Sequence, residues 1–198
     1  MLQPSLDSLK REKPGTLVPV YKEILADLET PVSVFLKIMR NEQNAIFLES
    51  VELGEKLGRY SFILFGSNKI LSSHGNVLDV IEKEMEEKRR RFKRSPDLPS
   101  FQGGYVGYLA YENVRHFETI QLNPDKKGLG LPESVFFWVD RFIVFDHVDQ
   151  KMRIVVLVEC GPALEKNYAQ AVREIEEVET KISEGTTLRR KVSRNHDF

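Results

Sequence analysis

Short runs of apolar, β-branched and aromatic residues recur along the chain and predict a set of strands. These strands are expected at 17–24, around Ile46, and at 60–65, 69–73, 135–144 and 152–159. The turn residues 146–150 give the strongest hairpin signal in the chain. Strands 60–65 and 69–73 are expected to pair antiparallel, because their connection is so short. Asp140–Arg141 interrupts the apolar run 135–144 and predicts either an internal ion pair or a crossing between sheets.

Apolar residues at helical spacing predict helices between and after these strands. Helices are expected over 4–12, after Thr30, and over 76–94, 112–118 and 162–184. Thr30 and Pro31 suit the N-cap and the first position of the second of these helices. Its predicted apolar stripe consists of Val32, Phe35, Leu36 and Met39. The last helix has the plainest core face, formed by Leu164, Tyr168, Ala171, Val172, Ile175, Val178 and Ile182.

Several antiparallel strands with segregated helices predict an α+β fold of mainly antiparallel sheet with flanking helices. This pattern excludes a parallel, doubly wound sheet. Residues 1–185 are expected to form one domain, and the polar segment 186–198 is expected to be a tail or a truncated linker.

Composition describes an ordinary globular protein, with 41% apolar and 30% charged residues and a net charge of −1. The chain therefore has no overall field that favours nucleic acid or membrane, and the basic run 88–94 fits a solvated helix C-terminus. No apolar run is long enough to span a bilayer, and the polar start of the chain predicts no signal peptide. The single cysteine, Cys160, fits a reducing cytoplasm. The four histidines show no metal-ligand spacing, so no metal site is expected.

Candidate chemistry is concentrated at the strand around Ile46. Alternation places the side chains of Ile46, Leu48 and Ser50 on one face of this strand. A hydroxyl at the mouth of an apolar slot suits a small amphiphilic ligand. Glu49 could hold an ammonium group, and Lys56 or Arg59 could meet a carboxylate, so an amino acid with an apolar side chain is the natural ligand. The alternative is that Glu49 and Ser50 only end a strand and open a turn. Elsewhere no residue pattern indicates catalysis, because a hairpin turn explains the adjacent Asp146 and His147.

Four segments resemble the N-terminal part of anthranilate synthase component I, in the same order along the chain. They are LVPVYKEILADLETPVSVFLKI (17–38), LES with GEKLGRYSFI (48–50 and 54–63), GGYVGYLAYENVRHFE (103–118) and FIVFDHVDQKM (142–152). Together they cover most of residues 15–155. In that family the Leu-Glu-Ser segment binds feedback L-tryptophan. The resemblance therefore implies a tryptophan site formed by Leu48, Glu49, Ser50, Val51, Lys56 and Arg59.

The same resemblance implies the wider activity of the family. The complete component I converts chorismate to anthranilate and pyruvate with Mg²⁺, and a glutamine amidotransferase subunit, component II, supplies the ammonia. The family's catalytic half, with its chorismate and Mg²⁺ ligands, would follow Phe198, so the 198-residue chain alone is expected to be inactive. Two alternatives remain open from the sequence: part of the related aminodeoxychorismate synthase component I, or a stand-alone tryptophan-binding module.

Overall fold

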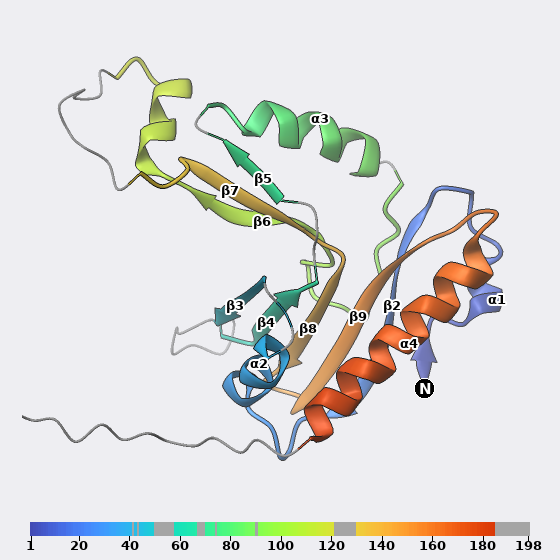
Figure 1. The fold of residues 1–198 in the computed structure, drawn as a ribbon. Helices are drawn as coiled ribbons and strands as arrows, with labels where there is room; N and C mark the ends of the chain where they lie inside the picture. Colours follow the sequence, from blue (N-terminus) through green and yellow to red (C-terminus); the bar gives the residue numbers. More distant parts are fainter. Residues whose placement is uncertain are drawn as a thin grey trace, which may run out of the picture.

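The computed structural model describes residues 1–40, 42, 44–49, 58–66, 70–73, 75–89, 91–120 and 130–184. Within them, two antiparallel sheets lie side by side (Figure 1). The first has six strands in the order β1-β2-β9-β8-β4-β3, and the second has three in the order β5-β7-β6. Their bounds are β1 Leu2–Gln3, β2 Leu17–Leu25, β3 Ala45–Glu49, β4 Tyr60–Phe65, β5 Ile70–Ser73, β6 Gly104–Leu109, β7 Ser134–Val139, β8 Arg141–Asp146 and β9 Lys151–Glu159.

Helices flank both sheets, which confirms the predicted α+β class. Helices α2 and α4 lie against one face of the six-stranded sheet, and α3 lies along the three-stranded sheet (Figure 1). The helices are α1 Leu6–Leu9, α2 Pro31–Met39, α3 Leu78–Arg89, the 3₁₀ helix η1 Tyr111–His116, and α4 Leu164–Ser183. The division into a domain of 1–185 and a tail stays a prediction, because 185–198 lie outside the described residues. No helix in the described part combines the length and the apolar character that a membrane crossing requires.

The core is divided between the two faces of the six-stranded sheet, because successive side chains of a strand point to opposite faces. On one face, Ile143 and Ile154 pack with Ile175 of α4. On the other face, Phe142 and Val155 form a second cluster with Tyr21, Leu64, Leu98, Val139 and Val144. The predicted core face of α4 is largely confirmed, since Leu164, Ala171, Ile175, Val178 and Ile182 are buried.

Strands β7 and β8 pass almost without interruption from one sheet into the other. Strand β7 belongs to the three-stranded sheet and β8 to the six-stranded sheet, and only Asp140 separates them (Figure 1). Arg141 Nε lies 3.8 Å from Asp140 Oδ1. The sequence offered an ion pair or a sheet crossing here, and the structure contains both.

The predicted pairing of strands 60–65 and 69–73 is wrong. Strand β4 pairs with β3 and β8, whereas β5 pairs with β7 in the other sheet. Gly66, directly after β4, has a φ of 78° and lies against the guanidinium of Arg141. The chain leaves the first sheet at this left-handed residue, a conformation that glycine adopts without steric cost. A short connection therefore joins two sheets rather than two neighbouring strands.

The predicted apolar stripe of α2 is also wrong in part. The helix begins as expected, with Thr30 and Ser33 forming a reciprocal capping box. Its buried side chains include Val34 and Ile38, while the exposed fractions of Val32, Leu36 and Met39 are 47%, 36% and 47%. Seven of its nine residues are apolar or proline, so periodicity does not select one face. Lys37 is buried as well, because it pairs with Glu29 and donates a 2.5 Å hydrogen bond to the carbonyl of Ile182.

Candidate functional site

The candidate site lies at the end of β3, an edge strand of the six-stranded sheet (Figure 1). Strand β3 pairs with β4 from Ala45↔Phe65 to Glu49↔Ser61. Ile46 packs against the second core cluster, whereas Phe47 on the opposite face stacks on Phe35 of α2 with ring centroids 5.4 Å apart. The predicted alternation along β3 is therefore confirmed for Ile46 and Phe47.

The structure describes three of the six residues predicted to bind tryptophan. Leu48 is 43% exposed, and Glu49 is exposed beside it at the end of β3. Arg59 directly precedes β4. The other three, Ser50, Val51 and Lys56, lie outside the described residues, so their roles stay predictions.

Arg59 is held by two acidic side chains of the β8–β9 turn. Its Nε donates to Asp146 Oδ1 at 2.9 Å and its Nη2 to Asp146 Oδ2 at 2.7 Å, a bidentate arrangement. Nη2 also lies 3.1 Å from Asp149. These bonds raise the pKa of Arg59, so its charge is permanent. The structure thus gives Arg59 an internal carboxylate partner.

Asp146 is the centre of this turn. Its side chain is 2% exposed, and it also accepts hydrogen bonds from the backbone N–H groups of Val148 and Asp149. Burial raises the pKa of the Asp146 carboxyl, but the bonds from Arg59 and the two backbone groups outweigh burial and leave that pKa below its ordinary value. The turn interpretation of Asp146 is confirmed. Its pairing with Arg59 was missed, and the two residues are 87 positions apart.

A buried hydroxyl lies close to the same turn. Ser61 Oγ is 2.7 Å from His147 Nε2, and Ser61 is fully buried opposite Glu49. This contact joins the start of β4 to the residue after β8. A hydroxyl without exposed surface cannot reach a substrate, so the Ser61–His147 pair is structural.

The space beside Ile46 is small. A pocket of about 10 Å³ lies between the two sheets, lined by Asn44, Ile46, Leu64, Phe65, Phe137 and Val139. That volume holds about one water molecule. This pocket is too small for an indole ring, whereas Leu48 is exposed.

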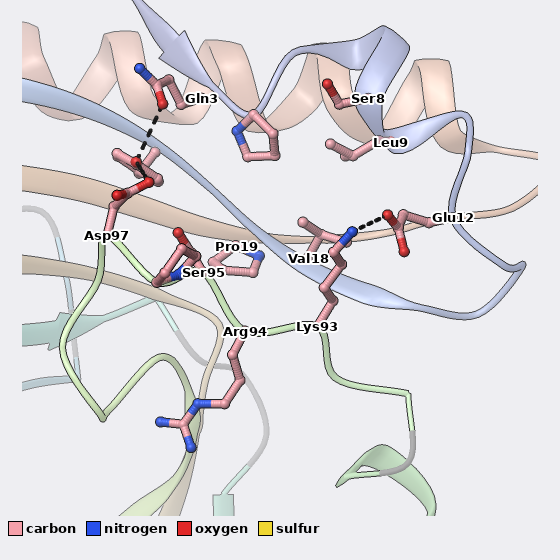
Figure 2. Close-up of a pocket in the computed structure, with 13 residues that line it drawn as sticks. Gln3, Ser8, Leu9, Glu12, Val18, Pro19, Lys93, Arg94, Ser95 and Asp97 are labelled. Carbon is pink, nitrogen blue, oxygen red and sulfur yellow. Dashed lines mark hydrogen bonds and ion pairs between the residues drawn. The ribbon is translucent and has the colours of Figure 1, made fainter.

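A second pocket, of about 220 Å³, lies between α1, β2 and residues 93–97 (Figure 2). The Tyr21 hydroxyl lies 3.2 Å from Asp97 Oδ2, and Lys93 forms an ion pair with Glu12. Burial and the neighbouring Asp97 charge raise the pKa of Tyr21. Figure 2 shows that Lys93 and Glu12 are directed at one another across the pocket, while Arg94 points away from it. The pocket contains none of the predicted site residues.

No group of three or more His, Cys, Asp or Glu side chains that could hold a metal ion occurs within the described residues. These residues therefore do not fit the Mg²⁺ that the resemblance implies for the complete enzyme.

The single cysteine, Cys160, is buried, which raises the pKa of its thiol. It therefore serves as a core residue.

Comparison with known proteins defines the class first. Residues 43–198 match the model of the chorismate binding enzymes, and the chain belongs to that family. It is 34% identical over 198 residues to anthranilate synthase component 1 of Acetivibrio thermocellus, covering 92% of this chain and 40% of that protein. It is 35% identical over 180 residues to the probable anthranilate synthase component 1 of Schizosaccharomyces pombe, covering 89% and 36%. The chain thus spans about 40% of the length of the curated relatives it matches.

A solved structure supports the fold. The crystal structure of anthranilate synthase component I from Streptococcus pneumoniae TIGR4 matches with a TM-score of 0.50 and 19% identity. The match covers 83% of this chain and 37% of that chain. At this identity the likeness bears on the fold alone, and it agrees with the antiparallel α+β architecture.

Proposed function

We propose that this chain is the N-terminal regulatory part of an anthranilate synthase component I and that it binds feedback L-tryptophan. The observation that supports this most is the identity of 34% over 92% of the chain to anthranilate synthase component 1. By this proposal the complete protein converts chorismate to anthranilate and pyruvate with Mg²⁺ in the cytoplasm. A component II, a glutamine amidotransferase, supplies its ammonia. The relatives named above favour this branch over aminodeoxychorismate synthase.

The end of β3 provides suitable chemistry for the ligand. Ile46 and Leu48 share one face, and Ser50 is next in that series. The indole packs on Leu48 and Val51, and the ammonium group is held by Ser50 and the exposed Glu49.

The ligand carboxylate requires a cation. Arg59 already has bidentate hydrogen bonds to Asp146. If Arg59 paired with the ligand carboxylate, the buried Asp146 would lose its main cationic partner. Leaving a buried carboxylate unpaired costs free energy. We therefore assign the carboxylate to Lys56, and Arg59 borders the site as the residue that fixes the start of β4.

Binding at this edge also suggests how inhibition is transmitted. Strand β4 lies between β3 and β8, and Arg59 joins its start to the β8–β9 turn. A ligand that favours one position of the 48–59 segment thereby favours one position of β8. Feedback then follows from the difference in ligand affinity between two arrangements of the sheet.

Calorimetric titration of the chain with L-tryptophan tests the proposal. Ser50→Ala removes a hydrogen bond to a charged group and is expected to weaken binding about 10- to 150-fold. Ser50→Phe fills the slot and is expected to abolish binding. Lys56→Gln should weaken binding similarly to Ser50→Ala. The matched control is Ser72→Ala at an exposed position of β5. If the wild-type chain releases no heat with tryptophan, or if both Ser50 variants bind as the wild type does, the proposed site is wrong.

A further inference from the structure

A further pocket belongs to none of the sites discussed so far. It has a volume of about 540 Å³ and lies between α4, the end of α3 and the crossing from β7 to β8. Six separate stretches of sequence contribute to its lining, which includes Lys88, Trp138, Asp140, Arg141, Leu157 and Gln170. This volume is within the range of small-molecule binding sites.

The charges of this pocket balance. Three cationic side chains, Lys88, Arg91 and Arg141, face three anionic ones, Asp140, Glu159 and Glu174. Most are already paired: Arg91 forms an ion pair with Glu159, and Arg141 lies 3.7 Å from Glu174. Equal numbers of positive and negative charges disfavour a simple anion or cation and suit a ligand that carries both signs.

Asp140 is the least compensated of these groups. Its Oδ1 is buried and accepts no hydrogen bond from any described residue. Its neighbour Arg141 is 3.8 Å away, and that guanidinium also donates to the carbonyl of Gly66. Burial raises the pKa of the Asp140 carboxyl despite the nearby Arg141 charge. The side chain as a whole is 41% exposed, so a ligand in the pocket can reach the carboxylate. A positively charged donor at this exposed part of the side chain would compensate the charge of the carboxylate.

Lys88 and Trp138 supply the other half of the site. The Lys88 ammonium lies 3.9 Å from the centre of the Trp138 ring, and its ion pair with Glu84 is long, at 3.6 Å. Trp138 and Asp140 both line the pocket. The pocket therefore offers an aromatic ring beside the cationic Lys88 and the anionic Asp140.

We propose that this pocket binds a small zwitterion with a primary ammonium group and a carboxylate, which is amino-acid chemistry. The ammonium group pairs with Asp140, the carboxylate pairs with Lys88, and the apolar part of the ligand contacts Trp138. This site is separate from the proposed tryptophan site at the end of β3 and does not depend on it.

The chain contains one tryptophan, Trp138, which lines this pocket and a neighbouring one, so its fluorescence reports binding at either, and the Asp140 variant below distinguishes the two. The probes are glycine, 4-aminobutanoate and 6-aminohexanoate, which increase the separation of the two charges, with butylamine and butanoate as singly charged controls. We expect at least one zwitterion to change the fluorescence saturably, with a Kd at least tenfold below those of both single-charge controls. No saturable change with any zwitterion, or equal Kd values for the controls, would overturn the proposal.

Variants test the assignment of each group. Asp140→Asn and Lys88→Gln are each expected to raise the Kd of the best zwitterion about tenfold or more, because each loses a charge-assisted contact. The matched control Asp79→Asn, at an exposed position of α3, should leave it unchanged. Far-UV circular dichroism establishes that each variant is folded, and either variant alone suffices if the other unfolds. Ser50→Phe should leave the Trp138 signal intact, which separates this site from the tryptophan site. A wild-type Kd in both folded variants would contradict the assignment.

Discussion

Arg59 and Asp146 form a bidentate ion pair that joins the start of β4 to the end of β8, with N–O distances of 2.9 and 2.7 Å. The pair is at the edge of the proposed tryptophan site, and Asp146 is almost completely buried. In the proposed site, Arg59 would therefore act through the strand that it anchors. This relationship separates the two basic residues that the sequence had left as equal candidates for the ligand carboxylate.

The first prediction is that Asp146→Ala destabilises the chain by about 2–3 kcal/mol. The substitution removes hydrogen bonds from Arg59, Val148 and Asp149 to a buried charged group. The measurement is urea unfolding followed by circular dichroism. Asp149→Ala is the matched control: its carboxylate is 48% exposed, and such a pair contributes less than about 1 kcal/mol. Equal losses in the two variants would show that burial of Asp146 is unimportant.

The second prediction is that the contribution of Asp146 to stability decreases at acidic pH. The folded state lowers the pKa of Asp146 below its ordinary value of 3.8, so folding favours the charged carboxylate. This contribution to stability is complete well above pH 3.8 and is lost as the pH falls through that value toward the folded pKa. We expect the stability difference between wild type and Asp146→Asn to shrink over this window. Unfolding free energies at pH 6, 4 and 3 measure it, and a difference that stays constant with pH would refute the linkage.

The third prediction is that Gly107→Ala disrupts the three-stranded sheet. A Cβ at Gly107 would lie 1.9 Å from the carbonyl oxygen of Val135 in the neighbouring strand β7, so the backbone must shift. Overpacking of this kind costs about 1–3 kcal/mol. Gly130→Ala is the comparison: its φ of 70° brings backbone strain, but no atom lies within 4 Å of the added Cβ, so it lacks the steric clash. Thermal unfolding should show a larger loss for Gly107→Ala, and the reverse order would contradict the close approach.

The fourth prediction is that the 198-residue chain forms no anthranilate from chorismate, ammonia and Mg²⁺. No metal-binding cluster occurs in the part of the chain that the structure describes, and the chain spans about 40% of its relatives. Anthranilate fluorescence is the assay, and a complete component I serves as the positive control. Turnover by the purified chain would place catalytic groups within these residues.

The sequence predicts elements of this fold better than it predicts their partners. The strands and the β8–β9 hairpin follow from long apolar runs and turn residues, whose signals are local. The exit of the chain from the first sheet at Gly66 depends on contacts with Arg141, 75 residues away, so adjacent strands were wrongly paired. The buried face of α2 was misassigned because that helix is apolar nearly all round, and a buried Lys37 is explained only by Glu29 and Ile182.

In the candidate site, too, local features could be predicted from the sequence, whereas contacts between distant residues could not. Alternation along β3 correctly separated Ile46 from Phe47, because period two is a property of the strand itself. The ion pair between Arg59 and Asp146 was not predictable, because an ion pair between distant segments produces no pattern in the local sequence. Asp140 was noticed because it interrupts an apolar run, but its unsatisfied oxygen and its pocket required the fold.

The position of β2 in the six-stranded sheet has a consequence for biosynthesis. Apart from the two-residue β1, its neighbour is β9, with a register that runs from Leu17↔Glu159 to Leu25↔Lys151. Ribosomes add roughly 5–20 residues per second, so β2 precedes its partner by on the order of ten seconds. During that interval the nascent chain carries an unpaired, largely apolar strand that chaperones can bind. The sheet can close only after residue 159 has left the ribosome.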